Sequence, residues 1–150
     1  MIRRHFITTL AAGLVLRPLK GLSALVPDPN LDFLVIGDWG TGGSLQKKVA
    51  QGMHNALAKP TVSGWPKFVL STGDNIYPSG VTSAMDPQWV TKYEKIYRGL
   101  DLPWWSILGN HDHRGDPDAQ VAYGKRNPQW NMPGRTWSKE FDIDGVTKVS

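Results

Sequence analysis

Hydrophobic residues gather along this chain in short continuous runs, and each run leads into a glycine followed by a polar residue. Three such runs span residues 31–36, 67–72 and 103–108. Apolar runs of this length, bounded by turn residues, are typical of strands in a parallel sheet. The near-continuous apolar character of 31–36 also predicts that the first strand is buried on both faces.

Helical patterns fill the two intervals between these strands. Ser44 is a candidate N-cap for a helix that continues to Lys59. Asp86 followed by Pro87 predicts the start of a second helix, which continues to Arg98. The apolar side chains at helical spacing, which we expect to face the core, are Leu45, Val49, Met53, Ala56 and Leu57 in the first helix and Trp89, Tyr93, Ile96 and Tyr97 in the second. The alternation predicts an α/β fold with a parallel sheet and right-handed crossovers.

The last third of the chain predicts one short helix and one hairpin. Asp116 and Pro117 would cap the helix, which continues to Gly124. Residues 137–143 and 146–150 would form the two strands of the hairpin, joined by a turn at 144–145.

The N-terminus has the layout of an export signal. Two arginines, Arg3 and Arg4, precede an apolar stretch over 6–16, which is too short to be a stable membrane anchor. The paired arginines resemble a twin-arginine signal. We expect residues 1–24 to be removed after Ala24, leaving one domain over 25–150; the alternative is an N-terminal helix that stays attached.

This leader changes the meaning of the net charge. The whole chain carries 17 basic and 13 acidic residues, a formal charge of +4. Four of the basic residues and no acidic one lie in the leader, so the rest of the chain is balanced. The charge therefore gives no reason to expect a nucleic-acid partner. Because the chain has no cysteine, any metal must bind to oxygen and nitrogen ligands.

Each predicted strand delivers an oxygen donor one residue after a glycine: Asp38, Asp74 and Asn110. An aspartate after a strand is often only a turn residue. The carboxyl ends of parallel strands meet at one edge of a sheet, however, where ligands bind. The glycine-rich loop that begins at Gly37 does not fit the dinucleotide-binding pattern, because Leu45 stands where its third glycine is required. We therefore predict one shared metal site.

The donor types narrow the chemistry of this site. A carboxylate can bridge two ions, and ion pairs about 3.5–4 Å apart are suited to phosphoryl transfer. Tyr77, three residues after Asp74, offers a phenol with an ordinary pKa of about 10. Binding it as a phenolate near neutral pH requires a strongly Lewis-acidic ion, and Fe(III) meets that need better than Mg²⁺ or Zn²⁺.

Residues 37–40, 73–77 and 109–112 together resemble the first three of the five metal-binding blocks of metallophosphoesterases. The tyrosine in the second block narrows the resemblance to purple acid phosphatases, and segments 119–123 and 129–133 are similar to the small tartrate-resistant type. The resemblance runs from about residue 31 to residue 150. It implies a metallophosphoesterase-type sandwich of mixed β-sheets flanked by helices, of which this chain would hold the N-terminal half.

Carried over by position, the resemblance implies a dinuclear centre. Asp38 and Tyr77 would bind the ferric ion, and Asp74 would bridge it to a divalent ion, which could be Fe, Zn or Mn. Asn110 would bind the divalent ion, and a metal-bound hydroxide would attack phosphorus. His111 would contact the phosphate or assist the leaving group.

His113 and Trp39 are implied to lie beside the site, in contact with its ligands or with the substrate. The function implied is an exported acid phosphatase, periplasmic or secreted, that hydrolyses phosphate monoesters. Two alternatives stay open: a phosphodiesterase of the same fold, using Mn or Zn, and an inactive fragment. The inactive fragment is an alternative because the family's remaining blocks supply three histidine ligands, which the histidines of this chain cannot replace.

Overall fold

The computed structural model describes residues 31–59, 65–142 and 148–149. The predicted leader and the predicted turn at 144–145 lie outside the described residues. No helix within these ranges is long and apolar enough to cross a membrane.

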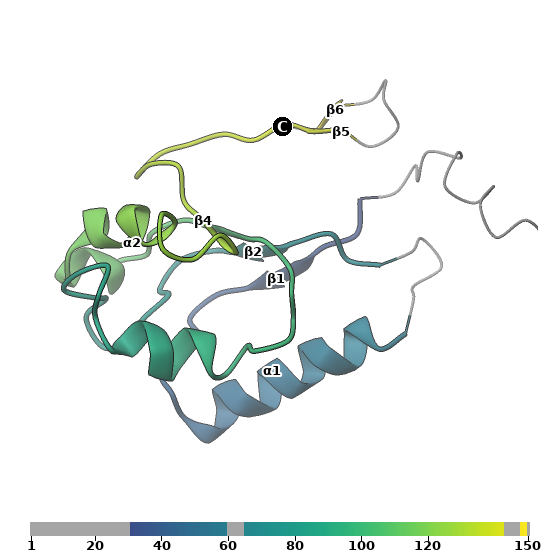
Figure 1. Ribbon diagram of the computed structural model, residues 1–150, viewed down its shortest axis with the longest axis horizontal. Helices are drawn as coiled ribbons and strands as arrows, with labels where there is room; N and C mark the ends of the chain where they lie inside the picture. The colour runs from purple at the N-terminus through teal and green to yellow at the C-terminus, as the bar shows by residue number, and fades with distance from the viewer. Residues whose placement is uncertain (1–30, 60–64, 143–147, 150) are drawn as a thin grey trace, which may run out of the picture.

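A four-stranded parallel sheet forms the centre of the molecule (Figure 1). Its strands, in spatial order, are β1 (Leu34–Ile36), β2 (Val69–Ser71), β3 (Trp104–Ser106) and β4 (Trp130–Asn131). Each strand pairs in parallel with its neighbour. The three predicted strands and the α/β class are confirmed. The fourth was not predicted, because only two residues pair there and no apolar run marks them.

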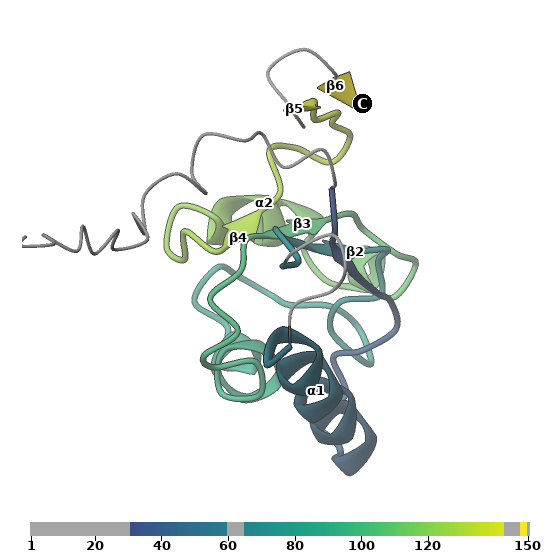
Figure 2. The same cartoon turned by 90° about the vertical axis from the view of Figure 1, so that its right-hand side faces the viewer.

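Helices pack on one face of this sheet. They are α1 (Ser44–Leu57) and a π-helical segment, η2 (Val90–Glu94). A 3₁₀ turn, η3 (Asp112–Arg114), and α2 (Pro117–Tyr123) follow β3. Figure 2 shows α1 on one side of the sheet and the pair β5 (Phe141–Asp142) and β6 (Lys148–Val149) on the other.

Helix α1 buries the predicted face only in part: Met53 is buried and Leu57 packs against the core, as predicted, but the first two turns differ. Leu45 and Val49 are exposed, whereas Gln46 and Ala50 are buried. Gln46 can be buried because its side-chain amide donates to the carbonyl oxygen of Lys92 and its Oε1 accepts from a backbone N–H. In the first two turns of the helix, the buried positions therefore lie one residue after the predicted ones. The predicted N-cap was also wrong by one residue: the cap is the residue before Ser44, and the helix ends two residues before Lys59.

The prediction that β1 is buried on both faces was wrong. Phe33 is 42% exposed and Val35 is 59% exposed, while Leu34 and Ile36 pack against the core. The physical reason is that β1 is an edge strand whose second face is not covered by either helix.

The second predicted helix forms, but not as a regular α-helix. Asp86 accepts a hydrogen bond from the backbone N–H of Gln88, as an N-cap does. The helix then widens into the π-helical segment, in which the N–H of Lys95 bonds to the carbonyl oxygen of Val90, and single turns replace it before Arg98. The predicted cap of α2 is confirmed, because the side chain of Asp116 accepts two backbone N–H bonds.

The C-terminal hairpin is shorter than predicted. Among the described residues of the hairpin, β5 and β6 pair in antiparallel fashion, and residues 137–140 are not in a strand. Trp137 instead donates its indole N–H to the carbonyl oxygen of Ser106. The ring of Phe141 stacks on Phe68 with centroids 4.4 Å apart, so the hairpin packs against the sheet face that the helices leave open.

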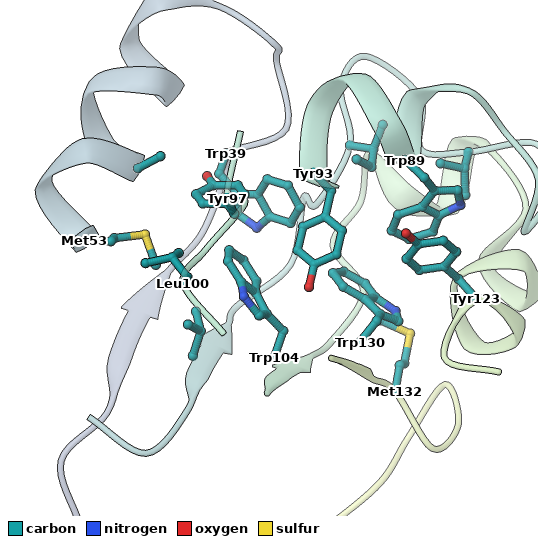
Figure 3. Packing of buried hydrophobic residues seen from close by; sticks show 14 of the residues in the cluster. Trp39, Met53, Trp89, Tyr93, Tyr97, Leu100, Trp104, Tyr123, Trp130 and Met132 are labelled. Carbon is teal, nitrogen blue, oxygen red and sulfur yellow. The ribbon is translucent and has the colours of Figure 1, made fainter. Parts of the chain in front are cut away.

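Aromatic rings fill the core between the sheet and the helices (Figure 3). Trp39 packs edge-on against Trp104 with centroids 5.3 Å apart. Trp89 stacks on Tyr123 of α2 at 3.7 Å. Large rigid rings bury much area at a low cost in side-chain entropy, so this cluster forms a stiff layer on the face of the sheet that the helices cover.

Two buried serines at paired positions of β2 and β3 should respond oppositely to alanine. Ser71 bonds to the indole N–H of Trp39 and to Oδ1 of Asn75, whereas Ser106 is the one buried side chain without a partner among the described residues. We expect Ser71→Ala to lower the free energy of unfolding by about 1–3 kcal/mol and Ser106→Ala to leave it equal or raise it slightly. Urea unfolding of both variants checks this, and equal losses would contradict it.

Candidate metal centre

The three predicted oxygen donors lie in the loops that follow three parallel strands, at the carboxyl edge of the sheet. Asp38 lies two residues after β1, Asp74 three residues after β2 and Asn110 four residues after β3. The backbone N–H of Asp38 donates to the carbonyl oxygen of Gly73 at 3.1 Å. Oδ1 of Asp74 accepts from the backbone N–H of His111 at 2.8 Å. The loops after all three strands are thus bonded into one structure.

Tyr77 joins the two aspartates. Its hydroxyl lies 2.7 Å from Oδ1 of Asp38 and 3.0 Å from Oδ2 of Asp74. The hydrogen bond to Asp38, together with burial and the bond to Asp74, raises the pKa of Tyr77 well above its ordinary value. Three oxygen atoms from two loops therefore converge within hydrogen-bonding distance.

Both aspartates have a left-handed backbone conformation. The φ angle is 55° at Asp38 and 51° at Asp74. Aspartate adopts this region more readily than most residues, but at some cost in conformational energy. In both loops the left-handed residue directs its carboxylate to the hydroxyl group of Tyr77. The backbone strain therefore lies at the two aspartates that converge on this tyrosine.

Two glycines allow the second and third loops to touch. A Cβ atom at Gly73 would lie 2.7 Å from the backbone nitrogen of Gly109, and a Cβ atom at Gly109 would overlap the Asp74 carboxylate. The glycines before Asp74 and Asn110 are therefore required by close approach of the two loops.

His111 lies beside this cluster with one ring nitrogen free. Its ring packs against that of Tyr77 with centroids 4.4 Å apart. Nδ1 lies 2.6 Å from the carbonyl oxygen of Pro78 and 3.2 Å from a guanidinium nitrogen of Arg114. Because a carbonyl oxygen can only accept, the shorter contact places a proton on Nδ1. Nε2 is then the atom available to a ligand.

The other predicted site residues lie outside the cluster of Asp38, Asp74 and Tyr77. Asn110 is exposed, and its backbone is held on both sides because its neighbours Gly109 and His111 each donate to a carboxylate. His113 is exposed on η3. Trp39 is 4% exposed and belongs to the aromatic core, where its indole N–H donates to a serine of β2.

Sequence reasoning missed a buried polar group under the site. Asn75, Asp112 and Gln120 are each 0% exposed and bond to one another. Gln120 carried a usable signal, because it is a polar residue between the buried positions Ala119 and Tyr123 of a short helix. Nothing local distinguished Asn75, whose partners lie in other loops.

The donor set fits a hard metal ion only in part. Carboxylate and phenol oxygens are ligands for hard cations. Within the described ranges, no three His, Asp or Glu side chains gather closely enough to hold a metal by themselves. The cluster thus offers two carboxylates and a phenol, with further ligands still required.

The chain matches a known protein family and is similar to several known proteins. A family model described as calcineurin-like phosphoesterase matches residues 31–148. The tartrate-resistant acid phosphatase type 5 of Mus musculus is 36% identical over 122 residues, which is 78% of this chain and 37% of the mouse protein. Purple acid phosphatase 3 of Arabidopsis thaliana is 46% identical over 98 residues, which is 63% of this chain and 26% of the plant protein.

A solved structure shares the fold. It is described as "GAP50 the anchor in the inner membrane complex of Plasmodium" and superposes with a TM-score of 0.58 at 28% identity, covering 79% of this chain and 39% of its own. This chain therefore spans less than half the length of each of these relatives.

Proposed function

Because the chain belongs to the calcineurin-like phosphoesterase family, we propose that it contributes the first ligands of a dinuclear metal centre in an acid phosphatase. The proposed substrates are phosphate monoesters, and the proposed ions are Fe(III) with a divalent partner: Fe, Zn or Mn. The named relatives, which are tartrate-resistant and purple acid phosphatases, support this choice of activity.

One observation carries the proposal: the hydroxyl of Tyr77 lies 2.7 and 3.0 Å from the carboxylates of Asp38 and Asp74. A phenol held between two carboxylates matches a ferric ligand set better than a site for Mg²⁺, which prefers carboxylates and water. Asp38 and Tyr77 would hold the ferric ion, Asp74 would bridge, and Asn110 would bind the divalent ion. When bound, the two ions supply Lewis acidity and positive charge for transfer of the phosphoryl group to water.

The protein's own part in the reaction is to orient the substrate and move a proton. The Pro78 carbonyl oxygen holds the His111 ring with Nε2 free. A proton on Nε2 would let this nitrogen donate to a phosphate oxygen or protonate the leaving alcohol. Arg114, 3.2 Å from the ring, adds a positive charge on the same side, which favours an anionic substrate.

Hydrolysis of two test substrates distinguishes the proposal from its nearest alternative. The full-length protein loaded with iron and zinc should hydrolyse para-nitrophenyl phosphate faster at pH 5 than at pH 8. It should hydrolyse bis(para-nitrophenyl) phosphate at least tenfold more slowly. The reverse preference, with a neutral or alkaline optimum, would indicate a phosphodiesterase instead.

A non-catalytic role is the second candidate, and the solved relative described as an anchor favours it. It predicts no turnover of either ester by the metal-loaded protein. Measurable phosphatase activity that a chelator removes would exclude it.

Export is part of the proposal and has its own test. We infer that residues 1–24 direct the protein out of the cytoplasm. Mass spectrometry of the protein recovered from the periplasm or medium should find a mature N-terminus after Ala24. A protein that keeps Met1 in the cytoplasm would contradict export.

A further inference from the structure

Asp112 is a buried carboxylate that the proposed reaction does not use. It is 0% exposed, and five hydrogen-bond donor groups surround it. The backbone N–H of Asn75 lies 3.0 Å from both of its oxygens. The backbone N–H groups of Ile76 and Gly109 donate at 3.2 and 2.9 Å. Burial of a carboxylate is costly unless its oxygens are fully hydrogen bonded, and here both oxygens accept.

We propose that Asp112 is a positioning residue of the metal centre, which fixes the placement of Asp74 relative to Asn110 and His111. The inference rests on the proposed function, because it concerns the ligands of that same site. It adds a residue to which no metal or substrate contact is assigned.

The two loops hold each other through reciprocal contacts. Asp74, in the second loop, accepts from the backbone N–H of His111 in the third loop at 2.8 Å. Asp112, in the third loop, accepts from the backbone N–H groups of Asn75 and Ile76 in the second. Each loop thus offers a carboxylate to the backbone of the other. Two contacts in opposite directions fix both the distance between the two loops and their relative orientation, whereas one contact would leave the orientation free.

The same contacts hold the strained turn. Asp74 has a φ of 51°, and the two N–H groups that follow it in the chain both donate to Asp112. A left-handed residue persists only where its surroundings over-determine its conformation. Asp112 supplies that constraint next to the proposed bridging ligand.

Side-chain bonds close the group into a triangle. The side-chain amide of Asn75 donates to Asp112 at 3.2 Å and to Gln120 at 3.0 Å, and that of Gln120 donates to Asp112 at 2.8 Å. The backbone carbonyl of Gln120 accepts from the indole N–H of Trp130 at 2.9 Å. Helix α2 and β4 are thereby connected to the metal-binding loops.

The chemistry of the triangle requires a carboxylate at its centre. All partners of Asp112 are N–H donors, so both of its oxygens must accept. An asparagine would direct its own NH₂ group at one or more of these donors and leave buried groups without acceptors. Asp112→Asn is therefore the sharpest change, because it keeps the shape and removes one acceptor.

Metal affinity is the measurement that tests positioning. The full-length protein, stripped of metal, is titrated with Mn²⁺ alone by calorimetry, and its thermal unfolding is recorded without metal. Loss of a group that orients metal ligands typically weakens binding about 10–100-fold, and we expect that loss for Asp112→Asn. Asp118→Asn is the matched control. It removes the same charge from an exposed side chain that pairs only with Arg135 at the surface, and its affinity should stay within about twofold of wild type.

A second variant keeps the inference testable if Asp112→Asn does not fold. Gln120→Met retains a similar volume and leaves Asp112 its backbone donors, so we expect about threefold to tenfold weaker Mn²⁺ binding in a folded protein. A folded Asp112→Asn with wild-type affinity, whatever its melting temperature, would show a purely structural role and overturn the inference. The same result for Gln120→Met would overturn it if Asp112→Asn is insoluble. Failure of the wild-type protein to bind Mn²⁺ would instead remove the proposed function, and the inference with it.

Discussion

Replacing Asp74 with asparagine should lower kcat/KM for a phosphate monoester by about 10³-fold or more, because the centre loses about 4 kcal/mol of transition-state stabilisation. A ligand that bridges two cations needs the negative charge of a carboxylate, and asparagine offers only a neutral oxygen. The fold should survive, since asparagine also tolerates the left-handed conformation that Asp74 adopts. Its remaining oxygen can still accept from the His111 backbone N–H.

The measurement combines kinetics with metal content. Elemental analysis of the Asp74→Asn protein should show fewer than two ions per chain. Asp101→Asn is a matched control, because Asp101 also has a positive φ, of 47°, and is exposed. Asp101 precedes β3, so it lies at the end of the sheet opposite the proposed metal centre. This variant should keep wild-type activity. An Asp74→Asn enzyme with unchanged kcat/KM would exclude a bridging role.

Replacing Tyr77 with phenylalanine should abolish the colour of the iron-loaded protein. The colour would come from charge transfer between a phenolate and Fe(III), and phenylalanine has no oxygen to take part. The change removes one hydroxyl that lies between Asp38 and Asp74, so the carboxylates and the ring contact with His111 are retained. The visible absorption band should therefore vanish while folded protein is recovered.

Visible spectra of three proteins test this claim. Tyr97→Phe serves as the control, because Tyr97 is buried in the aromatic core and its hydroxyl has only a 3.5 Å contact with Gln46. That variant should keep the band. A wild-type enzyme that is active yet colourless, or a Tyr77→Phe protein that keeps its band, would refute a ferric ion bound to Tyr77.

The positions of the strands and of the proposed metal donors could be predicted from the sequence because both are local. An apolar run between turn residues forms a strand, and the first polar residues after it must lie at the strand's end. Parallel pairing then brings the ends together. Asp38, Asp74 and Tyr77 were therefore predicted as one cluster, and the structure brings these three together.

The buried faces were predicted less well, because they depend on partners far along the chain. Leu45 and Val49 fit an apolar stripe but are exposed, because Gln46 finds an acceptor in Lys92, 46 residues away. Phe33 and Val35 are exposed because β1 lies at the sheet edge. The order of the strands in the sheet and the face that a helix buries depend on tertiary contacts, so the spacing of apolar residues along the chain does not predict them.

By itself, the sequence determined where the proposed metal ligands lie: carboxylates one residue after a glycine at the strand ends, and a phenol three residues after the second of them. Only the tertiary structure decided how those atoms are held. Asp112 and Asn75 lie 37 residues apart, and Asn75 and Gln120 lie 45 apart, so no local pattern marks them as partners. A polar side chain can be buried only where distant groups satisfy it, and those groups meet only in the folded protein.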